Sequence, residues 1–299
     1  MTSPAPKERI VRLGDRQHLA GILTLPHELR AETPFVVLVS AGVVHRVGPN
    51  RLYVDLARSI AAKGYPVLRF DLSGLGDSET VQGGASLTES VLADVRTALD
   101  FLQHTRGASS FIIGGLCSGA NDSMLAAFAD SRVTGVLLID PSVPRTRRSV
   151  LVHHARRLQH PATWAKLLTL QHPLVRRSLG WLRSLEVARA ADGQSQLQHM
   201  VPAQQPSQAE TRLALRTLIE RGVQLMFVFT GGINHQYNYR DQLFDVLPGF
   251  DFRDQMRLEF MPDTDHTVSD RVGRAHLLRA IGDWMHDSFS LAERSRASL

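Results

Sequence analysis

The only cysteine of the 299-residue chain, Cys117, lies between Gly115 and Gly119. An apolar run at 111–113 precedes it, and an Ala/Leu/Met-rich stretch that favours a helix begins at Ala120. A nucleophilic side chain between two glycines at a strand-to-helix turn is the nucleophile-elbow pattern G-x-Nuc-x-G. Glycines suit this turn because it strains the backbone and brings strand and helix close together. We therefore predict that Cys117 is a nucleophile; the alternative is a small hydrophobe packed in an ordinary turn.

A cysteine nucleophile needs a general base, and His266 is the candidate among the 13 histidines of the chain. It follows the last predicted strand, 256–261, and precedes the last predicted helix, 270–288. Loops at that position lie at the carboxyl edge of a parallel sheet, which is also the edge of the elbow. We predict that His266 is the base; the alternative is a solvated loop histidine beside Asp265.

Two residues are candidates for the group that orients His266. Asp140 ends the predicted strand after the elbow, and Asn234 follows the next predicted strand. A carboxylate fixes the imidazole tautomer and stabilises the imidazolium, whereas an amide only fixes the tautomer. Cys–His catalysis tolerates an amide because the ion pair forms before the substrate is attacked. The residue types alone therefore leave both candidates open.

Backbone N–H groups are expected to bind the oxyanion that develops during attack on a carbonyl. One donor is predicted from Ser118, which follows the nucleophile, and another from the loop at Gly42 and Val43. Ser118 also opens the predicted helix. The positive end of the helix dipole, which lies at this N-terminus, should lower the pKa of Cys117.

The remaining pattern indicates how these residues are held. A hairpin is predicted at 8–25, and buried strands alternate with helices from residue 35 onward. This alternation predicts an α/β protein with a mostly parallel, doubly wound sheet and helices on both faces. Only helical patterns occur over 141–222. We therefore predict one core, 1–140 and 223–299, interrupted by a helical cap at 141–222.

Composition narrows the class of protein. Hydrophobic residues make up 43% and charged residues 21% of the chain, as in soluble proteins with a large core. A single cysteine excludes an internal disulfide, and we see neither a signal peptide nor an apolar run of membrane-spanning length, so we expect a cytoplasmic protein. No zinc-ligand spacing occurs, and the glycine-rich segment 70–78 lacks the P-loop pattern. We expect no metal and no cofactor.

The predicted cap is strongly basic. Residues 145–189 contain ten Lys or Arg against one acid, so this segment carries +9 and the rest of the chain −4 of the total +5. The pattern indicates either a solvated helical face or a docking surface for an acidic acyl carrier protein, coenzyme A phosphates or an anionic substrate. Nucleic acid is not expected, because no stripe of aromatic and basic residues lies outside the cap. The first candidates for this surface are Arg145, Arg147, Arg148, Arg156 and Arg157.

Together these features resemble the α/β-hydrolase superfamily. The resemblance is carried by residues 40–42, the D-x-x-G-x-G-x-S block at 71–78, the elbow and residues 265–267. Residues 41–51 and 64–71 are most similar to the serine-aminopeptidase-like branch, especially hydrolases associated with exosortase systems. The resemblance implies an eight-stranded α/β-hydrolase fold with the middle segment as a lid over an acyl pocket.

Two departures from the family pattern bear on mechanism. The branch usually keeps Asp where this chain has Asn234, whereas residues 135–141 resemble the strand end that supplies the acid in thioesterase domains of polyketide assembly lines. The resemblance therefore favours Asp140. A cysteine in the elbow resembles dienelactone hydrolases, polyhydroxyalkanoate synthases and some acyltransferases and thioesterases.

The expected function is acyl transfer through an S-acyl-Cys117 intermediate. A thiolate exchanges readily with a thioester because the two sulfur leaving groups have similar pKa values. We therefore expect a thioesterase or acyltransferase whose substrate is an acyl thioester on a carrier protein or coenzyme A. The alternatives are a small ester or lactone hydrolase of the dienelactone-hydrolase type and a non-enzymatic binding protein that uses the basic cap.

Overall fold

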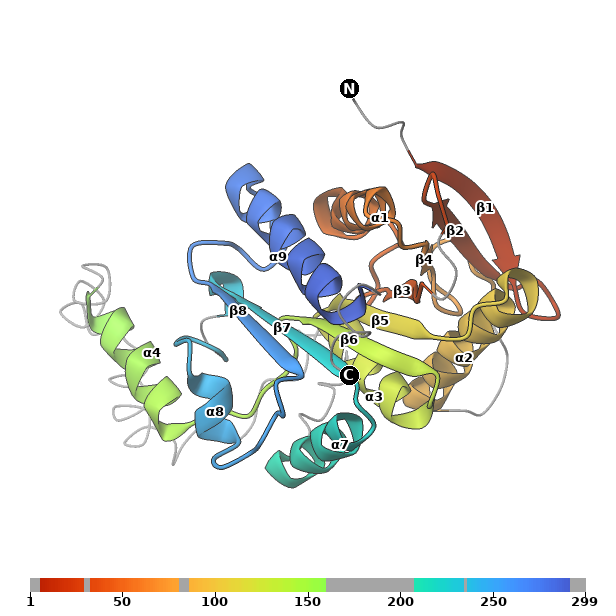
Figure 1. Ribbon diagram of the computed structural model, residues 1–299. Helices are drawn as coiled ribbons and strands as arrows, with labels where there is room; N and C mark the ends of the chain where they lie inside the picture. The colour runs from red at the N-terminus through yellow and green to blue at the C-terminus, as the bar shows by residue number, and fades with distance from the viewer. Residues whose placement is uncertain (1–5, 30–32, 81–85, 160–206, 234–235, 291–299) are drawn as a thin grey trace, which may run out of the picture.

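The computed structural model describes residues 6–29, 33–80, 86–159, 207–233 and 236–290 (Figure 1). Eight strands in this part of the chain form one sheet with the order β1-β2-β4-β3-β5-β6-β7-β8. The strands are β1 (Lys7–Leu13), β2 (Leu19–Leu25), β3 (Phe35–Val39), β4 (Val67–Phe70), β5 (Phe111–Leu116), β6 (Val133–Ile139), β7 (Gln224–Thr230) and β8 (Met256–Met261).

The sheet is antiparallel at one edge and parallel through the rest. β1 and β2 form the predicted hairpin, β2 pairs antiparallel with β4, and β4, β3, β5, β6, β7 and β8 are parallel. This arrangement confirms the predicted eight-stranded, mostly parallel sheet of an α/β-hydrolase fold.

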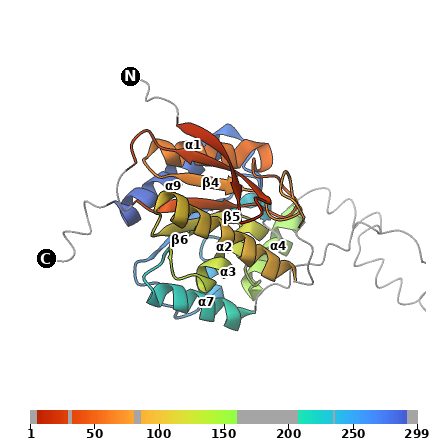
Figure 2. The same cartoon turned by 90° about the vertical axis from the view of Figure 1, so that its right-hand side faces the viewer.

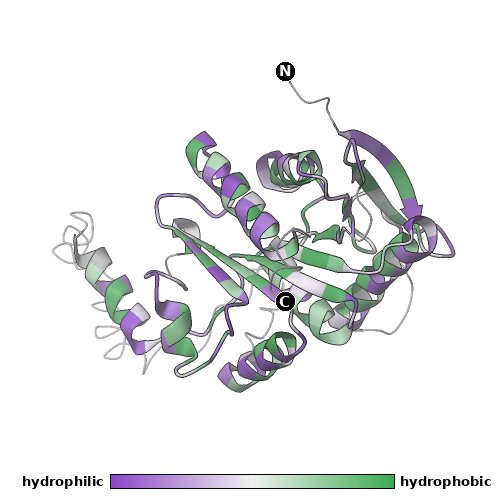
Figure 3. Cartoon of the chain, viewed as in Figure 1, coloured by the Kyte–Doolittle hydropathy of each residue, from purple (hydrophilic) through white to green (hydrophobic). Residues whose placement is uncertain are grey.

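Helices cover both faces of the sheet. Figures 1 and 2 show α1 and α9 on one face and α2, α3 and α7 on the other. Figure 3 shows hydrophobic residues along the central strands and a mixture of hydrophilic and hydrophobic residues on the covering helices. No described helix is long and apolar enough to cross a membrane. The α-helices are α1 (Leu52–Ala62), α2 (Leu87–Arg106), α3 (Ser118–Ala129), α4 (Arg147–Gln159), α7 (Gln208–Glu220), α8 (Gln242–Val246) and α9 (Arg271–Phe289), with short 3₁₀ helices η1 (Pro49–Arg51) and η2 (Gly231–Ile233).

Strand β3 shows why the central strands are continuously apolar. Its five residues are all buried. Val36 and Leu38 belong to the core cluster beneath α1 and α9, and Phe35, Val37 and Val39 belong to the cluster beneath α2, α3 and α7. Because both faces of a doubly wound sheet are covered, neither set of alternating side chains reaches water.

The register brings the predicted site residues to one edge. Val39 pairs with Gly115, Leu116 with Ile139, and Thr230 with Met261. The residues that follow these strands therefore emerge together at the carboxyl edge of the sheet. This is the edge at which open α/β sheets bind ligands.

The range predicted as the cap has two described parts. Helix α7 begins with a capping box between Ser207 and Glu210 and packs against α3, with Leu215 and Leu218 fully buried in the core. Helix α4 lies beside α8, where the Asn238 side chain donates to Ser149 O at 2.8 Å (Figure 1). Residues 160–206 lie outside the described residues.

Candidate active site

Cys117 lies at the turn between β5 and α3, as the elbow pattern predicts. Its backbone angles, φ 58° and ψ −119°, are strained for a side chain with a Cβ. A Cβ at Gly115 would lie 2.6 Å from Gly119 C, and a Cβ at Gly119 would lie 2.5 Å from Val39 O. Both glycines are therefore required by the close approach of α3 to β3 and β5. The turn leaves the Cys117 thiol exposed.

The structure brings Cys117 and His266 together. The thiol is hydrogen-bonded to the imidazole, and this bond is the main cause that lowers the pKa of Cys117 below its ordinary value. A hydrogen bond from the Ser118 N–H to the sulfur lowers the pKa further. The pKa of His266 is raised to about 10, first by its hydrogen bond to Asp140 and then by its hydrogen bond to Cys117. These opposite shifts favour the charged forms of both groups, a thiolate and an imidazolium.

Asp140 is the described residue that contacts the other side of the imidazole. Its Oδ2 lies 2.7 Å from His266 Nδ1, and its side chain is fully buried, whereas that of His266 is 33% exposed. Thr230 donates its N–H to Asp140 Oδ1 and its hydroxyl to Asp140 Oδ2, both at 2.7 Å. Three hydrogen bonds therefore fix the carboxylate, as a buried charge requires.

Asn234, the other candidate for orienting the base, lies outside the described residues. The segment that precedes it approaches His266 through its backbone. A Cβ at Gly232 would lie 2.1 Å from His266 N, so only glycine permits this approach.

The loop that follows β3, residues 40–48, is here termed the oxyanion loop. Gly42 has a left-handed φ of 51° and donates its N–H to the hydroxyl of Ser118 at 2.7 Å. The Val43 side chain is 70% exposed, and its N–H has no hydrogen-bond acceptor within the described ranges. Of the two predicted donors in this loop, Val43 thus has the N–H that is open to a ligand, and that of Gly42 is engaged by Ser118.

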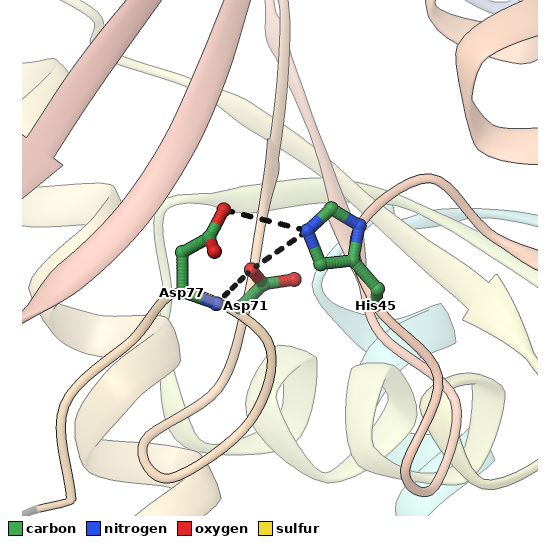
Figure 4. Close-up of side chains that lie close together, drawn as sticks. All are labelled: His45, Asp71 and Asp77. Carbon is green, nitrogen blue, oxygen red and sulfur yellow. Dashed lines mark hydrogen bonds and ion pairs between the residues drawn. The ribbon is translucent and has the colours of Figure 1, made fainter.

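A charged cluster fixes the oxyanion loop to the segment after β4. His45 Nε2 lies 3.5 Å from Asp71 and 3.6 Å from Asp77 (Figure 4). One ligand atom from each of these three side chains lies within 4.8 Å of the others, close enough to hold a metal ion. However, the guanidinium of Arg46 is paired with Asp71 and lies 2.6 Å from Asp77. The two carboxylates therefore already have a cationic partner, and we interpret the cluster as a clamp on the loop.

The loop that carries His266 is held by its neighbour Asp265. Asp265 accepts the N–H and hydroxyl of Thr267 at 2.8 and 2.6 Å, and those of Ser269 at 3.0 and 2.5 Å. These bonds, first that of the Ser269 hydroxyl, hold the pKa of Asp265 well below its usual range. The carboxylate of Asp265 therefore has a structural role: it holds the loop at 262–270 that carries His266, here termed the base loop.

Two contacts join the base loop to the chain that leaves the oxyanion loop. Asn50 donates to the Thr267 hydroxyl at 3.0 Å. Arg274 of α9 donates to Asn50 O at 2.8 Å, to Val268 O at 2.8 Å and to Asp55 at 2.7 Å. No local sequence pattern distinguishes Arg274, Arg46 or Thr230 from other surface or strand-end residues, so their part in the site could not be predicted from the sequence.

The cap arginines differ in what they contact. Arg148 stacks on Tyr239, 4.4 Å from the ring centroid, and lies 3.7 Å from Asp245. Arg145 and Arg147 are exposed, and no ion pair involves them within the described residues. Arg156 and Arg157 belong to α4, and their side chains lie outside the described part of the chain.

Comparisons with known proteins agree with this fold. The sheet and the elbow define an α/β hydrolase. The model of the serine aminopeptidase S33 family matches residues 35–207, more than half of the chain, and the protein belongs to this family of hydrolases. No curated protein matches the chain.

Solved structures with the same fold include three described hydrolases. An esterase from Pyrococcus furiosus has a TM-score of 0.59 and 10% identity, and covers 95% of this chain and 91% of its own. A proline iminopeptidase from Mycobacterium smegmatis has a TM-score of 0.55 and 14% identity over 94% and 98% of the two chains. A serine hydrolase without a lid from Xanthomonas campestris has a TM-score of 0.53 and 15% identity over 96% of both chains. At these identities the likeness shows the fold alone.

Proposed function

We propose that this hydrolase acts by acyl transfer through an S-acyl-Cys117 intermediate and that its substrate is an acyl thioester. The observation that carries the proposal is the chain of hydrogen bonds from Cys117 through His266 to Asp140 at the elbow. A hydrolase of the same fold is described as a serine hydrolase, whereas this chain has a thiol whose pKa is lowered by the neighbouring imidazole. A preformed ion pair of this kind attacks a carbonyl without first removing a proton.

In the first step, the Cys117 thiolate attacks the acyl carbonyl carbon and forms a C–S bond. The carbonyl oxygen becomes an oxyanion, which the N–H groups of Val43 and Ser118 stabilise. The intermediate collapses with cleavage of the bond to the leaving group, which takes the proton from His266. Asp140 holds the imidazole in the required tautomer and stabilises its charged form.

In the second step, neutral His266 removes a proton from the acceptor, which is water, an alcohol or an amine. The acceptor attacks the acyl-Cys117 carbonyl, the C–S bond breaks, and the sulfur leaves as thiolate beside the imidazolium. A thiolate is a weaker base than an alkoxide, so a thioester releases its leaving group more readily than an unactivated oxygen ester does. This favours thioesters over unactivated oxygen esters as acyl donors.

The basic residues of the predicted cap support the proposal that an acidic carrier delivers the acyl group. The exposed side chains of Arg145 and Arg147 follow β6 and Asp140, on the segment that leads away from the site. Cationic groups at the mouth of a site attract phosphate or carboxylate groups of a carrier protein or coenzyme A. The esterase and the lidless hydrolase of the same fold favour a second candidate, a small ester or lactone hydrolase.

The test is covalent capture of the intermediate. Incubation with butyryl-CoA should add one butyryl group to the protein by intact mass, and peptide mapping should place it on Cys117. Cys117→Ala should abolish the adduct, and an adduct that persists in this variant would reject Cys117 as the nucleophile. An adduct that forms from p-nitrophenyl butyrate but not from butyryl-CoA would favour the ester hydrolase instead.

The binding-protein alternative makes the opposite prediction. A scaffold that only binds needs neither an activated thiol nor an aligned base. Its Cys117 would react with iodoacetamide at neutral pH no faster than an ordinary thiol. Butyryl-CoA and p-nitrophenyl butyrate would then leave the mass of the protein unchanged and release neither free CoA nor p-nitrophenolate, and this result would reject the proposed enzyme.

A further inference from the structure

Ser118 contacts both halves of the candidate oxyanion site. Its N–H directly follows Cys117 in the chain and contributes to the lowered pKa of the thiol. Its hydroxyl oxygen accepts the Gly42 N–H at 2.7 Å, across 76 positions of sequence. One residue therefore adjoins the nucleophile through its backbone and contacts the oxyanion loop through its side chain.

The hydroxyl of Ser118 retains an unused proton. A serine hydroxyl that accepts one hydrogen bond can still donate one. Among the residues that the structure describes, nothing accepts the proton of Ser118, and the oxygen is held by Gly42. Because a peptide N–H donates to this oxygen, the O–H bond is polarised and becomes a stronger donor.

The engagement of Gly42 has a consequence for the site. The Gly42 N–H cannot donate at full strength to a substrate while it donates to Ser118. The N–H of Val43, by contrast, is open within the described ranges. The Gly42 N–H therefore acts on a substrate only indirectly, by polarising the Ser118 hydroxyl to which it donates.

We propose that the Ser118 hydroxyl is a catalytic oxyanion donor that acts with the N–H groups of Val43 and Ser118. In the tetrahedral intermediate the substrate oxygen carries the negative charge, and it accepts a hydrogen bond from the hydroxyl. The Gly42 N–H holds the hydroxyl in place and polarises it. This inference rests on the proposed acylation of Cys117.

The experiment separates oxyanion stabilisation from nucleophile strength. Ser118→Ala removes the hydroxyl and keeps both backbone N–H groups, whereas Ser118→Thr keeps the hydroxyl. The matched control is Ser109→Ala, an exposed serine before β5. Acylation is followed as the p-nitrophenolate burst from p-nitrophenyl butyrate, and alkylation with iodoacetamide reports the thiolate without forming an oxyanion. Intact mass confirms both products.

Acylation of Ser118→Ala should be about 100-fold slower than that of the wild type, the cost of losing one oxyanion donor. Its alkylation by iodoacetamide should be unchanged, Ser118→Thr should retain most of the acylation rate, and the control should match the wild type. Acylation of Ser118→Ala at an equal or higher rate would overturn the inference, because the hydroxyl would then be idle or would block Gly42. Equal losses of acylation and alkylation would overturn it as well, since they would show damage to Cys117. Absence of both an acyl adduct and p-nitrophenolate release in the wild type would reject the proposed function itself.

Discussion

Asp140 Oδ2 lies 2.7 Å from His266 Nδ1, although the two residues are 126 positions apart in the sequence. The carboxylate has no exposed surface, so its charge is balanced inside the protein by the imidazolium and by two donors of Thr230. This bond is the largest cause of the raised pKa of His266. It therefore sets the pH range over which the imidazole stays protonated beside the thiolate.

Replacement of Asp140 by Asn should narrow that range from the alkaline side. Without the carboxylate, the pKa of His266 falls from about 10, so the alkaline limb of the acylation rate moves to lower pH. The rate at neutral pH should drop by less than the ~10⁴-fold seen for Asn in a serine triad, because a thiolate forms more easily than an alkoxide. The measurement is the pH profile of acylation by p-nitrophenyl butyrate. An unshifted alkaline limb would contradict the role of Asp140.

Thr230 is expected to hold Asp140 in place. Thr230→Val removes the hydroxyl that donates to Asp140 Oδ2 and keeps the N–H that donates to Oδ1. The position is fully buried, so the free energy of unfolding should fall by about 1–3 kcal/mol, the cost of a lost bond to a buried charge. Urea titration measures this loss, and the acylation rate should fall with it. Thr230→Ser, which keeps the hydroxyl, should recover the acylation rate; if it does not, packing of the methyl group is the cause.

How far the site could be predicted depended on whether the signal was local. The elbow around Cys117 is a short pattern whose glycines are required by contacts within the same strand–helix unit, so the sequence predicts it well. Asp140 and Asn234 follow neighbouring parallel strands and could not be separated by pattern alone. Asp140 has a left-handed φ of 49° in the structure. No neighbouring glycine in the sequence indicates this backbone conformation.

The oxyanion donors show the same limit. The strand end and Gly42 mark the loop correctly. Which N–H is open to a ligand depends on the Ser118 side chain, which reaches the loop only in the folded protein. Similarly, α7 has a clear helix signal, but its packing against α3 could not be inferred from the absence of strands around it.

The reactivity of Cys117 with iodoacetamide should rise with pH about a midpoint below that of an ordinary thiol. The main cause is the hydrogen bond with His266, so the midpoint should shift to higher pH in His266→Gln. The rate constant at each pH, divided by its plateau value, gives the thiolate fraction directly. Equal midpoints in the two proteins would show that His266 does not stabilise the thiolate.

Gly119 is expected to be intolerant of any side chain. A Cβ there would lie 2.5 Å from Val39 O and 2.9 Å from Ser40 O, and neither backbone oxygen can yield without moving β3. Gly119→Ala should therefore lower the free energy of unfolding by about 1–3 kcal/mol, as overpacking does elsewhere. Leu125→Ala, at a 42% exposed position of the same helix, should change it by about 0.5 kcal/mol or less. Urea denaturation of both variants makes the comparison, and equal effects would contradict the close approach of α3 to β3.

Arg274 is expected to position the base loop rather than to touch the substrate. Its guanidinium joins Val268 O, two residues after His266, to Asn50 O and Asp55. Arg274→Ala should loosen this link, lower the acylation rate about tenfold for a contact worth about 1.4 kcal/mol, and raise the pH midpoint of Cys117 alkylation.

Arg274→Lys keeps the charge but cannot reach all three acceptors with one planar group, so it should restore the activity only in part. Arg279→Ala, at an exposed position of the same helix, should behave as the wild type. A lower melting temperature of Arg274→Ala without any change in the alkylation midpoint would show that Arg274 stabilises the fold alone. A shift of the midpoint that Arg274→Lys partly reverses would show that the geometry of the thiolate–imidazolium pair depends on the link between the two loops.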